Sequence, residues 1–149
     1  MIQYRLAEPS DADALAPLNG QLIRDEGHRN PMNVAQLAER MRSWLAGEYA
    51  SLLAEDAGQI IGYALFKTES DWVYIRHLFV IETHRRRGLG RELVDHVWQF
   101  APETVSRLRI DVLAGNTAGQ RFWHSLGFQD YAITMETERS ERKAISSNP

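Results

Sequence analysis

Residues 85–91 read Arg-Arg-Arg-Gly-Leu-Gly-Arg and lie between a predicted strand and a predicted helix. The first backbone N–H groups of a helix have no partner inside it, and the helix dipole favours negative charge there. Gly88 and Gly90 have no Cβ, so a phosphate group can approach the backbone closely. The stretch therefore predicts a pyrophosphate-binding loop. The alternative interpretation is a solvated, arginine-rich loop with a glycine turn.

Two well-known phosphate loops do not fit this stretch. A Walker loop ends in Gly-Lys-Ser/Thr, whereas Gly90 is followed by Arg91 and Glu92. A dinucleotide-binding loop has a third glycine or alanine, whereas the corresponding residue is Leu93. A nucleotide phosphotransfer protein is therefore disfavoured.

The composition is typical of one globular domain, with 149 residues of which 44% are hydrophobic and 25% are charged. There is no cysteine, so disulfides, thiolate metal sites and a thiol nucleophile are excluded. The five histidines are scattered, and we expect no metal site. The net charge of −3 argues against nucleic acid as a partner. No apolar run approaches the ~18 residues of a membrane span, so we expect a cytoplasmic protein without a membrane partner.

Hydrophobic periodicity predicts an α/β fold (a mixed α+β sheet) in the element order β-α-α-β-β-β-α-β-α-β. The polar residues 138–149 are expected to form a flexible C-terminal tail. The expected strands are 2–6, 49–54, 60–66, 72–81, 108–113 and 128–137, and the expected helices lie around 15–22, 34–45, 90–100 and 117–126.

The spacing Arg85-x-x-Gly88-x-Gly90, between a strand and an amphipathic helix, resembles the acyl-CoA loop of the GNAT superfamily, the acetyl-CoA-dependent N-acetyltransferases. The stretch Leu78–Val80 resembles the central strand of that family. The resemblance implies a single N-acetyltransferase domain over residues 1–137, with a GNAT-like twisted mixed sheet of six to seven strands and about four helices on both faces. A second family signature is matched by Asn116, Phe122, Gly127 and Phe128.

The same resemblance implies a set of residues that bind acetyl-CoA. The backbone of Phe79 and Val80 would pair with the pantetheine arm, and the loop amides would hold the pyrophosphate. Asn116 would form a hydrogen bond with the pantetheine arm. The implied cofactor-binding residues are Leu78, Phe79, Val80, Arg85, Arg86, Arg87, Gly88, Leu89, Gly90, Arg91, Asn116, Phe122 and Trp123.

The implied reaction is direct transfer of an acetyl group from acetyl-CoA to a primary amine. No protein nucleophile is needed when the amine is held close to the thioester carbonyl. A base must remove a proton from the amine, and the backbone N–H of Val80 is the implied donor to the developing oxyanion. The alternative is a catalytically decayed acyl-CoA-binding sensor or regulatory module, because Trp123 occupies the place of the family's usual tyrosine and no base is obvious.

The sequence leaves the general base and the general acid open. Strict alternation along residues 72–81 puts Ile75, His77 and Phe79 on one face, but a small bulge would change this. His77 then either faces the substrate or is buried with its hydrogen bonds satisfied. Glu82 either acts as a base through a water molecule or neutralises the charge of the neighbouring arginines. The candidates are Tyr74, Arg76, His77, Glu82 and Tyr131, with Ser125 as a further acid.

The segment between the first two helices lines the acceptor pocket in many members of the family, which implies His28, Arg29 and Asn30 as substrate-binding residues together with Arg76. A polar loop that caps a helix explains the first three almost equally well. Arg76 suggests that the acceptor carries a carboxylate or phosphate. The alternative is that Arg76 pairs with an internal acid such as Asp71 or Asp111. The expected acceptor is an amine on a small molecule or a peptide, and the resemblance is compatible with a homodimer.

Overall fold

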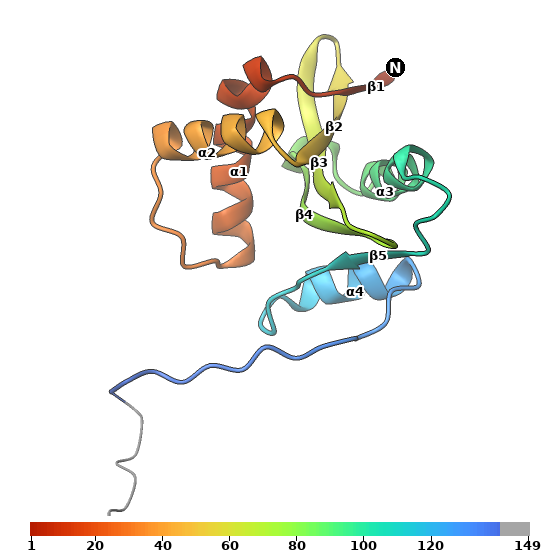
Figure 1. Ribbon diagram of the computed structural model, residues 1–149. Coiled ribbons are helices and arrows are strands. Elements are labelled where there is room, and N and C mark those ends of the chain that lie inside the picture. Colours follow the sequence, from red (N-terminus) through yellow and green to blue (C-terminus); the bar gives the residue numbers. More distant parts are fainter. Residues whose placement is uncertain (141–149) are drawn as a thin grey trace, which may run out of the picture.

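The computed structural model describes residues 1–140 and shows one five-stranded sheet in the order β1-β2-β3-β4-β5 (Figure 1). The first four strands are antiparallel neighbours and β5 runs parallel to β4, so the sheet is mixed as expected. Residues 141–149, which make up most of the expected tail, lie outside the described residues. The strands are β1 Ile2–Leu6, β2 Tyr49–Asp56, β3 Gln59–Thr68, β4 Trp72–Val80 and β5 Arg107–Ile110.

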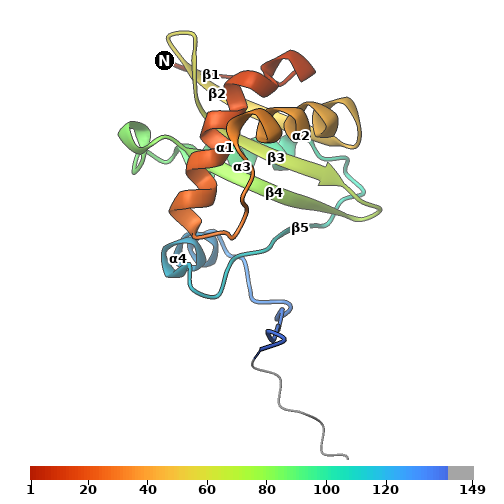
Figure 2. The same ribbon diagram turned by 90° about the vertical axis from the view of Figure 1, so that its left-hand side faces the viewer.

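Helices cover both faces of this sheet. The helices α1 and α2 lie together on one face and α3 lies on the opposite face (Figure 2). The last helix, α4, lies beside β5 (Figure 1). The helices are α1 Ala12–Glu26, α2 Val34–Ala46, α3 Leu89–Phe100 and α4 Thr117–Ser125, with short 3₁₀ turns η1 Pro9–Asp11 and η2 Glu82–His84.

The sheet separates two main hydrophobic clusters. On the α1–α2 face, Leu15 and Met41 pack against Tyr63 and Phe79 of the sheet. On the other face, side chains of α3 and α4 pack against the strands, and these include Leu93 and Trp123. Because β3 and β4 contribute to both clusters, the centre of the sheet is fixed from both sides and can hold a site rigidly.

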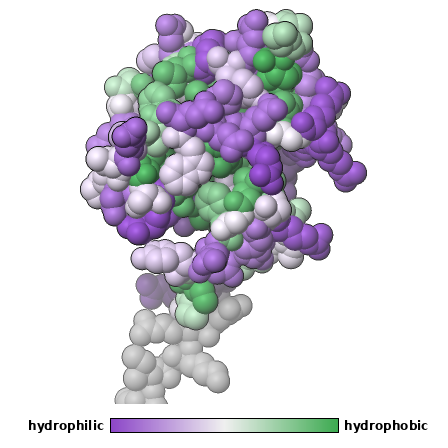
Figure 3. All heavy atoms as spheres, turned by 90° about the vertical axis from the view of Figure 1, so that its right-hand side faces the viewer, coloured by the Kyte–Doolittle hydropathy of each residue, from purple (hydrophilic) through white to green (hydrophobic). Residues whose placement is uncertain are grey.

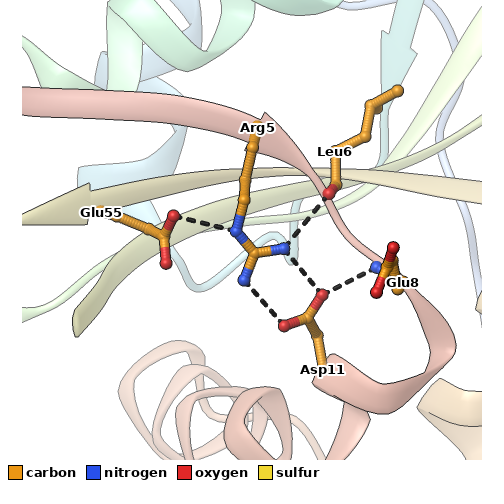
Figure 4. Close-up of polar contacts among 5 residues, drawn as sticks. All are labelled: Arg5, Leu6, Glu8, Asp11 and Glu55. Atoms are coloured by element: carbon orange, nitrogen blue, oxygen red, sulfur yellow. Dashed lines mark hydrogen bonds and ion pairs between the residues drawn. The ribbon is translucent and has the colours of Figure 1, made fainter. Parts of the chain in front are cut away.

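The start of the chain is held by an ion-pair network around Arg5 on β1. Its guanidinium donates to both carboxylate oxygens of Asp11, at 2.8 and 2.9 Å, and to Glu55 on β2 at 2.9 Å (Figure 4). Asp11 also accepts a hydrogen bond from the backbone N–H of Glu8 at 2.7 Å, which closes a cap over the 3₁₀ turn. The network ties the entry of α1 to β1, the edge strand of the sheet, and to its neighbour β2.

The capping of α2 follows from its sequence. Asn33 accepts from the backbone N–H of Gln36, and the Gln36 side chain accepts from the backbone N–H of Asn33, both at 2.9 Å. This capping box fixes the point at which the chain leaves the loop that contains residues 28–30. The loop thereby has a defined position between α1 and α2.

Two large hydrophobic residues near the end of α3 are more exposed than the apolar stripe of this helix suggests. Trp98 and Phe100 are 43% and 45% exposed, although the ring of Phe100 packs edge-on against Phe66 of β3 at 5.3 Å between centroids. Seen from the α3 side, hydrophobic patches lie among hydrophilic side chains (Figure 3). Only the inward stripe of this helix contributes to the core.

The expected strand at residues 128–137 is absent, so the expectation of six to seven strands is not met. The alternating side chains of Tyr131, Ile133 and Met135 are 79%, 83% and 85% exposed. A strand needs a partner backbone, and residues 128–137 pair with no other segment within residues 1–140, so the four-residue β5 remains the edge of the sheet. After α4 the chain instead runs on as an extended segment (Figures 1 and 2).

Candidate active site

A bulge in β4 decides which side chains face which core. Leu65 of β3 pairs with His77 and the next residue, Phe66, pairs with Ile75, so Arg76 is the extra residue. As a result Ile75 packs with the α3–α4 cluster and Phe79 with the α1–α2 cluster. The strict alternation expected from the sequence is therefore wrong across Arg76, because the bulge inverts the parity of the strand.

The same strand separates from its parallel neighbour after the bulge. The pairing of β4 with β5 covers only Trp72–Ile75 and Arg107–Ile110. The N–H of Ile81 donates to Ile61 on β3 at 2.8 Å, and successive residues of a strand direct their amides to opposite sides. The N–H of Val80 therefore points into the gap between β4 and β5, whereas the backbone of Phe79 points towards β3.

The loop after β4 has the conformation of an anion-binding helix start. The 3₁₀ turn Glu82–His84 leads to Arg86 and Gly88, whose φ angles are 64° and 80°. Gly88 is the N-cap of α3, and open space lies where its Cβ would be. A left-handed φ at this position favours glycine, and the free amides of the first turn of α3 are therefore exposed on this side.

Arg85 holds the loop against the rest of the fold. Its Nε donates to the carbonyl of Val80 at 2.7 Å, and its terminal nitrogen donates to Asp25 at the end of α1 at 2.8 Å. Its guanidinium also lies 5.4 Å from the ring centroid of Phe79. These contacts join α1, β4 and the loop at one corner of the site.

The start of α4 closes the opposite side. The side-chain oxygen of Asn116 accepts from the backbone N–H of Gly119 at 3.0 Å and so caps this helix. A Cβ on Gly119 would lie 2.4 Å from the Asn116 side chain. Trp123 is 7% exposed and packs against the rings of Phe122 and Phe128 at 5.0 and 4.8 Å between centroids.

One cavity of about 920 Å³ brings these parts together. It joins the gap between β4 and β5, the loop before α3 and the start of α4 to the C-terminal half of α1, the loop that follows it and Arg40 in the middle of α2. Of the implied cofactor-binding residues, Arg87 does not line it, and its guanidinium is directed to the carbonyl of Thr83 at 3.4 Å. The members of that set that line the cavity are Leu78, Phe79, Val80, Arg85, Arg86, Gly88, Leu89, Gly90, Arg91, Asn116, Phe122 and Trp123.

The structure divides the catalytic candidates into two groups. Tyr74, Arg76 and His77 line the cavity, as does Ser125, whose hydroxyl donates to the carbonyl of Phe122 at 2.6 Å. Glu82 in the 3₁₀ turn and Tyr131 are not among the lining residues. Tyr131 instead lies against the guanidinium of Arg109 at 4.6 Å.

His77 is held as a neutral ring. Burial, together with the charges of Arg40 and Arg76, lowers the pKa of His77 to about 3. Its Nδ1 lies 3.0 Å from the hydroxyl of Tyr63, a residue that is fully buried and whose pKa burial raises. A ring with so low a pKa binds a proton weakly, which makes it a poor general base at neutral pH.

Tyr74 also keeps its proton. Its hydroxyl donates to Asp111 at 3.0 Å, and burial together with this carboxylate raises the pKa of Tyr74 to about 12. Asp71 pairs with Arg107 at 2.7 Å. Neither acid that was considered as an internal partner of Arg76 contacts it, so that alternative is wrong.

The part of the cavity near the end of α1 contains a carboxyl group that sequence reasoning missed. Glu26, the last residue of α1, lines the cavity and lies 3.0 Å from Nε2 of His28. Burial raises the pKa of Glu26, and the contact with His28 opposes this effect. A carboxylate with a raised pKa is better matched to accepting a proton near neutral pH than His77 is.

Of the three residues between α1 and α2 that were predicted to bind the amine acceptor, only two line the cavity. His28 and Asn30 line the cavity, and Asn30 also accepts from the backbone N–H of Met32 at 2.9 Å. Arg29 points away and pairs with Glu136 of the extended segment at 2.7 Å. Two of the three residues thus line the cavity, and Asn30 also holds the backbone just before α2.

Further polar residues that line the cavity and escaped the sequence analysis include Asn19 and Asp25 of α1 and Arg40 of α2. A signal for two of them was present. Asn19 follows Leu15 by four residues on the buried stripe of α1, and Arg40 precedes Trp44 by four on that of α2. Burying a polar side chain on an apolar stripe costs free energy, so such a residue can be recognised in the sequence as a candidate for a site.

The part of the chain that the structure describes, residues 1–140, contains neither a metal-binding cluster nor a helix that could cross a membrane. Within this part of the chain no cluster of three or more histidine, aspartate and glutamate side chains is arranged to hold a metal ion. None of the helices described has the length and the apolar character that crossing a bilayer would require.

Known proteins resemble this chain in sequence and in structure. Residues 21–128 match the model of the acetyltransferase (GNAT) family. The chain is 27% identical over 121 residues to N-alpha-acetyltransferase 40 of Saccharomyces cerevisiae, an alignment that covers 68% of this chain but only 42% of the yeast protein.

Two solved structures show the same fold. A possible acetyltransferase from Clostridium difficile 630 superposes with a TM-score of 0.79 at 17% identity, over 97% of this chain and 99% of the other. A predicted acetyltransferase from Clostridium acetobutylicum, solved with acetyl-CoA, gives a TM-score of 0.77 at 22% identity, over 97% of this chain and all of the other.

Proposed function

Because the chain belongs to the GNAT acetyltransferase family, we propose that it transfers an acetyl group from acetyl-CoA to a primary amine. One observation carries this proposal: a single cavity joins the glycine loop and the gap between β4 and β5 to a second, polar end between α1 and α2. Two substrates that meet from opposite ends of one cavity need no protein nucleophile. The yeast relative is named for acetylation of an α-amine, which supports an amine as acceptor.

The residues present fit acetyl-CoA. The left-handed Gly88 with open space beside it and the free amides of the first turn of α3 suit a pyrophosphate. Arg86 and Arg91 line the same end of the cavity and add positive charge. Since Oδ1 of Asn116 caps α4, its Nδ2 is the atom that would donate to the pantetheine arm. When bound, acetyl-CoA supplies an activated thioester carbonyl.

The backbone of β4 has a defined part in this reaction. The N–H of Val80 points into the gap, where it would donate to the carbonyl oxygen as negative charge develops there. The N–H of Val80 belongs to the Phe79–Val80 peptide, on the side where Phe79 pairs with Tyr63 of β3, and the carbonyl of Val80, in the next peptide, accepts from Arg85, so the backbone is held on both sides of this residue. The donor is therefore preorganised.

We assign the role of base to Glu26. Its carboxylate would accept the proton that the amine loses, directly or through one water, as the new C–N bond forms and the C–S bond breaks. The released thiolate then takes up a proton from solvent, which requires little assistance because a thiol is fairly acidic. Trp123, in the place of the family's usual tyrosine, is buried against two rings and serves packing.

The test measures binding and turnover separately. Binding of CoA is measured by calorimetry, and release of free thiol from acetyl-CoA is followed with a panel of primary amines. Binding together with amine-dependent thiol release supports the proposal. Binding without turnover of any amine would favour the acyl-CoA sensor instead, and the absence of CoA binding would overturn both.

A further inference from the structure

The acceptor end of the cavity contains two arginines that share one aromatic ring. The guanidinium carbon of Arg40, on α2, lies 4.3 Å from the ring centroid of Trp44, and that of Arg76, at the β4 bulge, lies 4.7 Å from it. Both arginines line the cavity. Trp44 therefore holds two positive charges close together at the cavity wall.

These two charges have no carboxylate partner within residues 1–140. The polar contacts of Arg40 and Arg76 are long ones to neutral groups, at 3.3 Å to the side-chain oxygen of Asn19 and 3.4 Å to the hydroxyl of Tyr49. The acids that line the same cavity have other partners: Asp25 pairs with Arg85, Glu26 with His28, and Asp111 accepts from Tyr74.

The arrangement is unfavourable for the protein alone. Arg40 is half-buried, its Nε is buried without an acceptor, and burial together with the charge of Arg76 lowers its pKa. An uncompensated charge that has lost part of its hydration weakens the fold unless something binds to it. A bound anion would compensate both guanidinium groups.

Asn19 provides a second, independent observation. Its side chain is fully buried in the wall of the cavity, and its Nδ2 has no hydrogen-bond partner. This NH2 group, like the two guanidinium groups, can only donate, whereas Oδ1 of Asn19 accepts from Arg40. The wall therefore presents donors from Asn19, Arg40 and Arg76, and an oxyanion is the ligand that accepts from several donors at once.

We propose that Asn19, Arg40 and Arg76 form an oxyanion subsite, and that the amine acceptor of this protein carries a carboxylate or phosphate group that binds there. Trp44 holds the two guanidinium groups in place against its ring. The inference deepens the proposed function, on which it rests, because it names the chemical class of the acceptor. Arg76 follows Ile75, where β4 leaves β5, so an acceptor held by its anion at Arg76 presents its amine beside the thioester end of the gap.

The first experiment compares amines that differ in one group only. The pairs are β-alanine with β-alaninamide, 6-aminohexanoate with 6-aminohexanamide, and O-phosphoethanolamine with ethanolamine. We expect at least one anionic member to exceed its neutral partner in kcat/KM by about tenfold or more, as for a hydrogen bond to a charged group. The carboxylate and phosphate pairs distinguish the two oxyanions. Equal kcat/KM values within every pair would overturn the subsite while leaving the acetyltransferase proposal intact.

The second experiment tests the residues. Arg40→Gln and Arg76→Gln should each raise KM for the preferred anionic amine about tenfold, with CoA affinity unchanged and KM for its neutral partner unchanged. Arg42→Gln is the matched control, because Arg42 lies on the same helix but pairs with Asp13 at 2.8 Å. Equal losses for the anionic and neutral amines, or an equal effect of the control, would overturn the subsite.

A third measurement does not depend on turnover. Calorimetry compares binding of 6-acetamidohexanoate and 6-acetamidohexanamide to the protein, with and without CoA. Preferential binding of the carboxylate, lost in Arg40→Gln, supports the subsite even if no amine is acetylated. Indifference to the carboxylate contradicts it, whereas failure of the protein to bind CoA bears on the proposed function alone.

Discussion

The space beside Gly90 is filled by the ring of Phe122. A Cβ on this glycine would lie 3.0 Å from Cζ and 3.2 Å from Cε1 of that ring, and the next atom, in Leu78, is 3.9 Å away. Gly90 is thus needed for the close approach of α3 and α4, whereas Gly88 is needed for its left-handed backbone. Glycine is therefore required at these two positions for different physical reasons.

Replacing Gly90 with alanine should therefore reduce stability through packing. We expect Gly90→Ala to lower the free energy of unfolding by about 1–2 kcal/mol, because the ring of Phe122 must shift. Phe122→Leu should recover part of the loss in the double variant, since the smaller side chain leaves room for the methyl group. Urea unfolding of the two single variants and the double variant measures the coupling, and strictly additive losses would contradict the assignment.

A carboxylate at Gly88 should act on CoA binding directly. Gly88→Asp introduces negative charge at the start of α3 and should weaken CoA binding about a hundredfold or more. Gly58→Asp is the matched control, because Gly58 also has a φ of 80° with open space beside it but lies in the β2–β3 turn. Both variants carry the same backbone strain, so calorimetry with CoA should separate them, and equal affinities would exclude this loop as the pyrophosphate site.

The link between Arg85 and Asp25 should matter more for binding than for stability. The two side chains are 42% and 31% exposed, so their coupling in a double-mutant cycle is expected to be about 0.5 kcal/mol. Arg85→Ala should nevertheless weaken CoA binding, because it also frees the carbonyl of Val80. Asp25→Ala keeps that bond and should weaken binding less. A larger loss of CoA affinity in Asp25→Ala than in Arg85→Ala would show that the contact with Val80 is unimportant.

The pH dependence of turnover should report on Glu26. Its pKa is raised by burial, so kcat/KM should fall as the pH drops through a value above the ordinary glutamate range, because the protonated carboxyl cannot accept the amine's proton. Glu26→Gln should lower kcat by about 10²–10⁴-fold and remove this limb. Glu39→Gln, at an exposed position of α2, is the control. A profile unchanged by Glu26→Gln would place the base elsewhere.

His77 should make the fold sensitive to acid. The folded protein binds a proton at this ring only near a pKa of about 3, whereas the unfolded chain binds it near 6.5. The stabilising effect of the neutral ring is therefore present above pH 6.5 and is lost as the pH falls towards 3, at about 1.4 kcal/mol per pH unit. Urea unfolding between pH 7 and pH 4 should show a smaller loss in His77→Gln than in the wild type.

Much of the fold follows from local patterns in the sequence. The apolar stripes and the capping box at Asn33 give α1 and α2, and the turn at residues 55–58 gives the β2–β3 hairpin. The spacing of Arg85, Gly88 and Gly90 predicts a helix that begins with free amides, and α3 begins at Leu89. These features depend on residues close together in the chain, so the order of residues is enough to predict them.

The sequence by itself thus determined the order of most elements, the family resemblance and the glycine loop, because each rests on periodicity or short spacing. Only the tertiary structure decided the rest. The bulge at Arg76 depends on how β4 pairs with β3, and the missing strand after α4 depends on whether a partner backbone is available. The grouping of Asn19, Arg40 and Arg76 around one end of the cavity joins two helices and a strand. Such contacts arise from packing between elements far apart in the chain, and no local pattern specifies them.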